Sequence, residues 1–273
     1  MIITMHGQAT RYSNIKTDIR LAKETGYEAL VINSDKLIRY LEAGYTVNDL
    51  LSILKANEIL PICIDDIRGI ERLDREEHNK LMDECEFLCS IAQALKCPTI
   101  QLITSNGLLG RSWKEIRELT AKNIAKLADI AAEHGIRFQL EPMAWAPINS
   151  ISRSLEVIEA AERNNVGMNI DFWHLWAGSE TTPDEVAEMK PSLIYGVHFC
   201  DGVRPEGNEW NENELRGYLV NDGKVPIKDW VDAVRATGYD GMWAAEVFSP
   251  KFWEWDLKEI VIESKKRMTQ YLG

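Results

Sequence analysis

The chain has 273 residues, of which 45% are hydrophobic, and its formal net charge at pH 7 is −12. This much apolar material is enough for a large core and excludes an intrinsically disordered chain. The acidic balance, without any run of Lys or Arg, argues against nucleic acid or an anionic membrane as a partner, because phosphate binding requires a basic surface. No apolar run approaches the length of a membrane span and the first residues lack a signal-peptide layout, so we expect a cytoplasmic protein.

Short apolar runs that predict β-strands recur along the chain, at residues 2–7, 27–34, 60–66, 98–105, 136–143, 166–172, 193–201 and 239–248. Between them lie segments with helical periodicity, such as residues 112–135, in which apolar side chains recur at i, i+3, i+4 and i+7. Several of these segments end in a Gly directly before the next strand, which is typical of a helix C terminus: Gly26, Gly135 and Gly238.

Strands that alternate with helices predict parallel pairing through crossover helices. Eight such units in this length predict one closed (β/α)8 TIM barrel, a single domain over residues 1–273 in the α/β class. A doubly wound sheet is the alternative, but no GxGxxG or Walker-type loop follows any strand, so we expect no nucleotide cofactor. The five cysteines are odd in number and lie mostly in apolar segments, which predicts reduced core residues.

Metal-competent side chains stand at the ends of four consecutive predicted strands. The run 136–143 presents Glu141, 166–172 presents Asp171, 193–201 presents His198 and 239–248 presents Glu246. Chemistry in such barrels lies at the carboxyl ends of the strands, and neighbouring strands are about 4.8 Å apart, so the four side chains can converge on one ion. Three carboxylates and one imidazole make a hard site that suits Mn²⁺, Mg²⁺ or Co²⁺, with Zn²⁺ less natural.

These residues give the chain a resemblance to a known family. LEPMAW, NIDFWHLW, GVHFCDG and AAEVF occur in the order found in xylose isomerase-like TIM barrels, the group of sugar isomerases and epimerases with inosose isomerases and ketohexose 3-epimerases. The resemblance spans essentially the whole chain. It implies that Glu141, Asp171, His198 and Glu246 are metal ligands. It also implies that His174, placed one turn of loop after Asp171, reaches the substrate, as does Arg204 in HFCDGVR; Arg216 competes for the role of Arg204.

The chemistry implied is proton transfer through an enediolate, with Glu141 and Glu246 as candidate bases on opposite sides of the ion. Two bases would give an epimerase and one shuttling base an aldose–ketose isomerase. Loss of a β-hydroxyl would instead give a lyase or dehydratase, acting on a keto-inositol, a 3-keto-glycoside or a dehydroshikimate-like substrate. The sequence does not choose among these outcomes or name the native metal. One departure weighs against a ketohexose 3-epimerase: Pro147 stands where those enzymes carry a second glutamate.

Aromatic residues are expected to enclose a pocket for an unphosphorylated small molecule at this rim. Trp145 and Trp176 are the candidates for substrate contact, within a larger group that also has Trp173, Trp210, Trp253 and Trp255. Asp201 is either a partner of His198 or a turn residue, and His6 either faces the pocket or is structural. An apurinic-site endonuclease would need more ligands and a basic DNA face, and a barrel that only binds a ligand remains an alternative. The sequence does not indicate the oligomeric state, although such families often form dimers or tetramers.

Overall fold

The computed structural model describes residues 1–179, 181–207 and 209–273. Eight parallel strands form a closed barrel in which each strand pairs with its neighbour in sequence and β1 pairs with β8. The prediction of a (β/α)8 barrel is therefore confirmed. The strands are β1 (Ile2–His6), β2 (Ala29–Asn33), β3 (Leu60–Arg68), β4 (Thr99–Ile103), β5 (Arg137–Glu141), β6 (Val166–Asp171), β7 (Ile194–Phe199) and β8 (Met242–Ala245).

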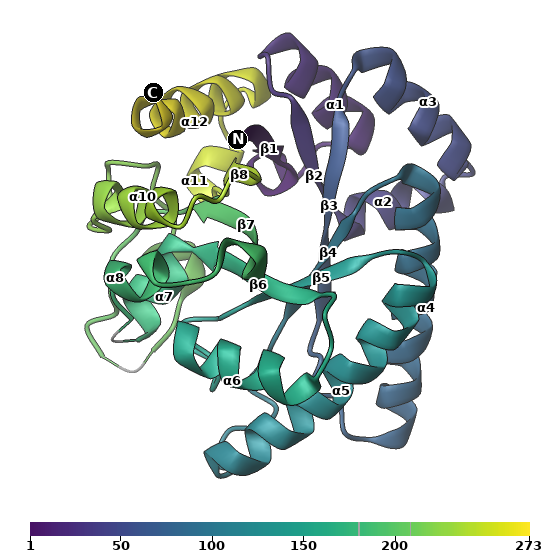
Figure 1. Cartoon of the computed structure of the whole chain (residues 1–273). Coiled ribbons are helices and arrows are strands. Elements are labelled where there is room, and N and C mark those ends of the chain that lie inside the picture. Colours follow the sequence, from purple (N-terminus) through teal and green to yellow (C-terminus); the bar gives the residue numbers. More distant parts are fainter. Residues whose placement is uncertain (180, 208) are drawn as a thin grey trace.

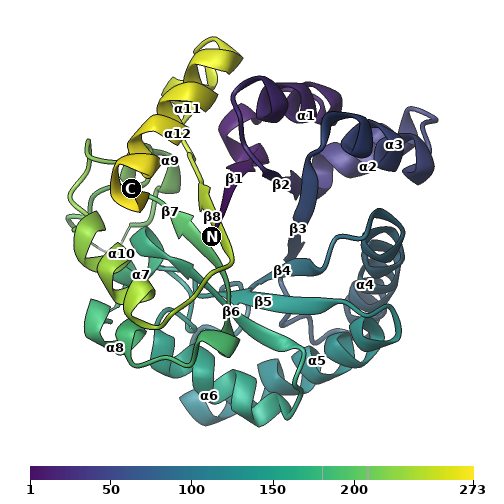
Figure 2. The same cartoon turned by 45° about the horizontal axis from the view of Figure 1, so that its top comes forward.

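Helices surround the strands on the outside of the ring, as Figures 1 and 2 show. They are α1 (Ile15–Glu24), α2 (Ser34–Glu42), α3 (Val47–Asn57), α4 (Arg75–Leu95), α5 (Trp113–Glu133), α6 (Ile151–Ala161), α7 (Phe172–Gly178), α8 (Pro183–Ala187), α9 (Glu212–Leu215), α10 (Ile227–Ala236), α11 (Pro250–Trp253) and α12 (Leu257–Leu272). Two short 3₁₀ turns, η1 (Gly7–Thr10) and η2 (Pro191–Leu193), complete the described elements. No helix among the described residues is long and apolar enough to cross a membrane.

Local signals in the sequence set the helix ends. Ser112 caps α5 together with Glu115 in a reciprocal capping box. The glycines predicted to stop helices adopt the left-handed conformation, with φ of 74° at Gly26, 70° at Gly135 and 80° at Gly238. These three helices, α1, α5 and α10, therefore end where the sequence predicts.

The barrel interior is built in layers, because alternate residues of a strand point to the same face. A small apolar cluster, separate from the main core, is formed by Val31, Cys63, Met242 and Ala244. The main core lies between the strands and the helices, and it contains the buried cysteines Cys85, Cys89, Cys97 and Cys200. All five cysteines are free and buried, as predicted.

A layer of buried amide side chains is formed by Gln101 on β4, Gln139 on β5 and Asn169 on β6. Gly196 on β7 makes room for this layer: a Cβ there would lie 2.7 Å from Gln139 Oε1 and 2.8 Å from Asn169 Oδ1. Two residues further along β5, β6 and β7 come Glu141, Asp171 and His198 of the carboxyl rim.

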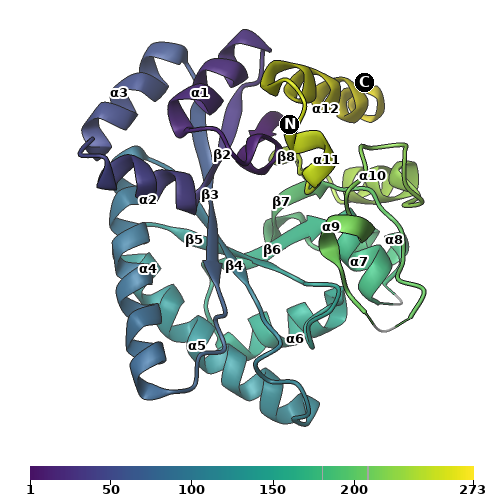
Figure 3. The same ribbon diagram turned by 180° about the vertical axis from the view of Figure 1, so that it is seen from behind.

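The connection between β7 and α10 is the longest excursion from the barrel and carries α9. Figure 3 shows it as a broad loop on the right of the view. Asp201 holds this loop together: its buried carboxylate accepts hydrogen bonds from the backbone N–H groups of Gly202, Asn221, Gly223 and Val225, at 2.7–3.0 Å. Of the two roles considered for Asp201, the structure favours the loop residue.

Candidate functional site

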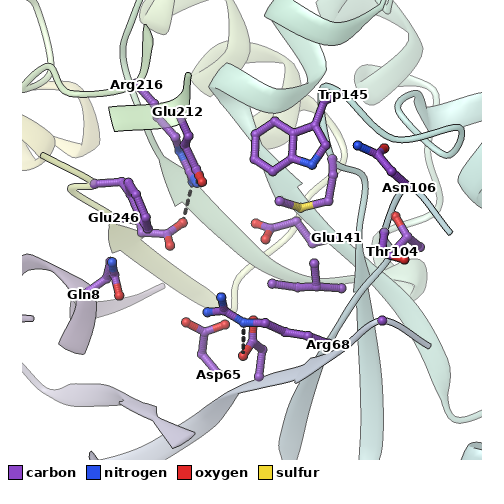
Figure 4. A pocket seen from close by; sticks show the side chains of 16 residues that line it. Gln8, Asp65, Arg68, Thr104, Asn106, Glu141, Trp145, Glu212, Arg216 and Glu246 are labelled. Atoms are coloured by element: carbon purple, nitrogen blue, oxygen red, sulfur yellow. Dashed lines mark hydrogen bonds and ion pairs between the residues drawn. The ribbon is translucent and has the colours of Figure 1, made fainter. Parts of the chain in front are cut away.

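A cavity of about 240 Å³ opens at the carboxyl ends of the strands. Figure 4 shows it as a bowl into which side chains from many strand ends project. Its size lies below the roughly 300–1,000 Å³ of pockets for drug-sized ligands, so it suits a small molecule. Most of the lining residues are polar, namely Gln8, Asp65, Asp66, Arg68, Thr104, Ser105, Asn106, Glu141, Glu212, Arg216 and Glu246, and Ile103, Met143, Trp145 and Phe248 add apolar surface.

The structure brings together the four strand-end residues that the sequence singled out. Asp171 on β6 is in register with His198 on β7, while Glu141 ends β5 and Glu246 directly follows β8. His198 Nδ1 lies 3.1 Å from Glu141 Oε1, 3.0 Å from Glu246 Oε2 and 4.0 Å from Asp171 Oδ2. One donor atom from each of the four residues lies within 4.8 Å of the others. A single ion can contact all four.

The electrostatics of this cluster favour a cation. Burial alone would lower the pKa of His198, but the carboxylates of Glu246 and Glu141 outweigh it and raise that pKa to about 10. Burial raises the pKa of Glu141 to about 7. Burial would also raise the pKa of Glu246, yet Arg216, His6 and His198 hold it well below its usual value. Three buried carboxylates thus require positive charge beside them, and the donor set of three carboxylates and one imidazole fits a divalent metal.

Amide side chains orient Glu141 from inside the barrel. Asn169 donates from Nδ2 to Glu141 Oε1 at 2.6 Å, and Gln101 donates from Nε2 to Glu141 Oε2 at 3.0 Å. Gln101 also donates to Asp65 Oδ1 at 2.9 Å and accepts from Gln139 at 2.6 Å. Each oxygen of Glu141 is therefore held by one amide, which fixes the carboxylate without neutralising its charge.

Asp171 and His174 lie in the first turn of the helix α7, whereas the sequence predicted a loop between them. Asp171 is the N-cap of α7, and its Oδ1 atom accepts a 2.7 Å hydrogen bond from the backbone N–H of His174. His174 Nδ1 accepts from the N–H of Ala144 at 3.1 Å, so a neutral ring carries its proton on Nε2. Burial lowers the pKa of His174 to about 3, which keeps the ring neutral.

The Nε2 atom of His174 has no hydrogen-bond partner among the described residues and lies 4.0 Å from Glu212 Oε1. The ring itself packs against Trp145 with 5.1 Å between centroids, and it does not line the cavity. His174 therefore lies one layer behind the wall formed by Trp145 and Glu212, with a free donor directed toward that wall.

Arg216, and not Arg204, reaches the site. Arg216 is 2% exposed, and its Nη2 atom contacts both Asp171 Oδ2 and Glu246 Oε2. Arg204 instead lies outside the cavity lining, with its guanidinium over the ring of Trp176 at 4.7 Å and a 2.7 Å hydrogen bond to the Trp176 carbonyl. The structure therefore places Arg204 and Trp176, which the sequence proposed for substrate contact, against each other and outside the cavity lining.

Of the six tryptophans expected at the rim, Trp145 is the one that lines the cavity. It packs against Trp173 and Trp210 with ring centroids 6.4 Å away in each case. Trp253 packs against Tyr12 and Phe248, and Trp255 against Phe252, and neither lines the cavity. The aromatic enclosure is therefore smaller than the sequence suggested.

The carboxyl end of β3 contributes cavity residues that the sequence analysis did not predict. Asp65 and Asp66 are buried there, and the Nε atom of Arg68 donates to both oxygens of Asp66, at 2.9 and 2.7 Å. All three line the cavity. The signal was present in the run ICIDDIR, where two acids follow an apolar strand, as at the other strand ends. His6 lies close by, with Nε2 at 3.7 Å from Asp65 Oδ2 and Nδ1 accepting from Gln8 N–H.

Comparison with known proteins places this geometry in context. The family model described as xylose isomerase-like TIM barrel matches residues 19–271. An inosose isomerase of Halalkalibacterium halodurans is 24% identical over 276 residues, which cover 95% of this chain and 93% of that protein. A 3-dehydroshikimate dehydratase of Pseudomonas aeruginosa is 24% identical over 230 residues, which cover 83% of this chain and 35% of that protein.

Among solved structures, a crystal structure of the IolI protein with a bound zinc atom superposes on this chain with a TM-score of 0.92. The match covers 100% of this chain and 98% of that one at 20% identity. At that level of identity the likeness concerns the fold, and the function of the site depends on the side chains that this chain places at its rim.

Proposed function

The chain belongs to the xylose isomerase-like TIM barrel family, and we propose that it is a divalent-metal-dependent isomerase or epimerase of a sugar, keto-sugar or keto-polyol. The observation that carries the proposal is the convergence of Glu141, Asp171, His198 and Glu246 within 4.8 Å at the carboxyl rim. The relative named inosose isomerase, which aligns over nearly the full length of both chains, supports the same reaction class.

We propose that these four residues hold the metal ion and that Mn²⁺ is the native ion. Carboxylate oxygens are hard ligands, and with one imidazole and no thiolate in the set they suit Mn²⁺ better than Zn²⁺. When bound, a divalent ion supplies a Lewis acid to a substrate carbonyl and lowers the energy of the negative charge that develops on its oxygen.

Glu141 and Glu246 are the residues that we propose to transfer the proton. Glu141 ends β5 and Glu246 follows β8, so they flank the intervening strands β6 and β7, which carry Asp171 and His198. A substrate carbon held between the two carboxylates can lose its α-proton to one of them, leaving an enediolate, and regain a proton from the same or the other carboxylate. Delivery of the proton to the neighbouring carbon of the enediolate gives an aldose–ketose isomer, and return to the original carbon from the opposite face gives an epimer.

Two further side chains would bind and orient the substrate. Arg216 lies against Asp171 and Glu246, where its guanidinium can donate to a substrate oxygen beside Glu246. His174 carries its proton on Nε2, which lies 4.0 Å from Glu212 Oε1. This N–H can donate to a substrate oxygen, or to Glu212 after a small shift of that side chain. Trp145 offers an apolar ring face for the C–H groups of a polyol.

A lyase is the second candidate. The enediolate formed by the same proton removal can expel a β-hydroxyl, and the dehydratase of Pseudomonas aeruginosa aligns with most of this chain. The first step is common to both reactions. An isomerase returns the proton to carbon, whereas a dehydratase passes one to the departing hydroxyl.

The proposal is tested by incubating Mn²⁺-loaded protein in D₂O with a panel of ketoses, inososes and keto-glycosides and following the α-proton by NMR. Wild-type protein should exchange that proton or pass it internally. Glu141→Gln and Glu246→Gln retain an oxygen donor but remove the base, so each should lower turnover by about 10²–10⁴-fold beyond any loss of metal. In a two-base epimerase, each variant should still exchange the α-proton of one epimer.

In a one-base isomerase or a lyase, one of the two variants alone should abolish exchange. The proposal is wrong if the metal-replete double variant turns over substrate at the wild-type rate, because neither carboxylate would then move the proton. A dehydrated product would select the lyase.

A further inference from the structure

Both cations in the cavity lining are already paired with buried carboxylates. Arg216 contacts Asp171 and Glu246 and bonds Glu212 at 2.9 Å. Arg68 binds Asp66, which is 4% exposed, through two hydrogen bonds from Nε. No other Lys or Arg among the described residues lines the cavity. The lining therefore offers no uncompensated positive side chain.

The two arginines stand on opposite sides of the barrel. Arg68 ends β3, whereas Arg216 lies on the connection after β7, four strands around the ring. In Figure 4 Arg68 occupies the lower part of the view beside Asp65, and Arg216 the upper part beside Glu212. Arg68 is therefore placed for the end of a ligand remote from Arg216.

Arg68 keeps free hydrogen-bonding capacity. Asp66 uses only its Nε–H, and no partner for its two terminal amino groups is found among the described residues. Its side chain is 59% exposed, while that of Asp66 is 3% exposed. The buried atoms Gln8 Nε2 and Thr104 Oγ1, on residues of the same lining, also have no partner among the described residues. The lining thus presents uncharged groups of Gln8 and Thr104 together with an arginine whose charge is already paired.

We propose that this pocket selects an uncharged polyhydroxylated ketone over a carboxylated one, and that the Arg68–Asp66 pair recognises adjacent hydroxyls at the far end of the substrate. The proposal rests on the proposed function and names the substrate class of the same site. A pair of adjacent hydroxyls can accept from the guanidinium and donate to the carboxylate. A substrate carboxylate at that position would lie near Asp65 and Asp66. Because Asp66 already neutralises the charge of Arg68, the carboxylate would lose its hydration without gaining an ion pair in return.

Two six-membered cyclic ketones provide the probes: an inosose, which is uncharged and carries only hydroxyls, and 3-dehydroshikimate, which carries a carboxylate. Binding to Mn²⁺-loaded protein is measured by calorimetry, and turnover by the proton-exchange assay. For wild-type protein we expect the inosose to bind at least about tenfold more tightly than 3-dehydroshikimate. A smaller ratio, or a reversed one, overturns the proposal.

Two variants of the pair test the residues themselves. Arg68→Gln should raise KM for the inosose about tenfold while kcat changes by less than about threefold, because a binding contact remote from the reacting carbon is lost. Asp66→Asn should release the charge of Arg68 and strengthen 3-dehydroshikimate binding about tenfold. The matched controls are Arg163→Gln and Asp129→Asn, which remove one partner of an exposed bidentate pair far from the cavity; neither should change the ratio.

An Asp66→Asn protein that is folded, as judged by its melting temperature, but has the wild-type preference would overturn the role of the pair. If that variant does not fold, the wild-type ratio and Arg68→Gln still decide the matter. Failure here is distinct from failure of the proposed function. Proton exchange on both ketones with a binding ratio below about tenfold would keep the function and refute the inference, whereas exchange on no ketone would refute the function.

Discussion

Asn169 donates a 2.6 Å hydrogen bond to Glu141 from within the barrel, so the orientation of a rim carboxylate depends on the layer beneath it. Asn169 is fully buried, and its neighbour in that layer, Gln101, holds the other oxygen of Glu141. The direction of the Glu141 side chain is therefore set before any ligand arrives.

Asn169→Ala should weaken Mn²⁺ binding by about 10–100-fold, because a carboxylate that loses its supporting hydrogen bond no longer points at the ion. The measurement is a calorimetric titration of metal-free protein. Asn165→Ala is the control, since Asn165 bonds backbone carbonyls outside the barrel, and its Mn²⁺ affinity should equal that of the wild type. Equal affinity in both variants would show that the amide layer does not orient Glu141.

Asp171→Asn and His198→Ala should each lower divalent metal content and activity together, because each removes one donor of the proposed set. Elemental analysis of purified, dialysed protein measures this. His174→Ala is the contrasting variant: its ring bonds the Ala144 backbone and lies behind Trp145. It should keep the metal and lose activity. Full, tight metal occupancy in Asp171→Asn or His198→Ala would refute the ligand assignment.

The two arginines of the β7–α10 connection should behave differently. Arg216→Gln should lower kcat/KM by at least about 10²-fold, since it removes a buried donor beside Glu246. Arg204→Gln should leave kcat/KM unchanged, because Arg204 stacks on Trp176 outside the cavity. Steady-state kinetics with metal content matched between the proteins checks both. The reverse pattern would mean that Arg204 moves into the site during turnover.

A buried ion pair stabilises the start of the barrel. Lys36 donates to Asp18 at 2.6 Å and to the backbone carbonyls of Gly7 and Thr10 at 2.8 Å each. Lys36→Met should cost about 3–5 kcal/mol in the free energy of unfolding, because Asp18 is left buried without its partner. Urea denaturation measures the loss, and Lys228→Met, at an exposed pair with Asp232, should leave the midpoint unchanged.

The double variant Lys36→Met/Asp18→Leu should recover part of that loss, since no charge then remains buried. If Lys36→Met alone unfolds at the wild-type midpoint, the buried pair does not contribute to stability.

Residues adjacent in sequence determined the barrel and four of its rim side chains. A parallel barrel alternates strands and helices, and its strand ends meet at one rim, so the apolar runs that end in Glu141, Asp171, His198 and Glu246 were enough to predict that these residues meet. The glycines that end helices could also be recognised from the sequence, because the left-handed conformation that they adopt involves the backbone of a single residue.

Tertiary structure decided which side chains outside the strands reach the cavity. Arg204 and Arg216 lie on the same connection between β7 and α10. The path of that loop depends on Asp201, whose carboxylate accepts hydrogen bonds from backbone N–H groups as far along the chain as Val225. Arg68 lies beyond the predicted strand end, and its role depends on the cavity that β4 and the β7 connection complete. Local periodicity determines where a strand ends, whereas the course of a long loop follows from hydrogen bonds between residues distant in sequence, which no local pattern records.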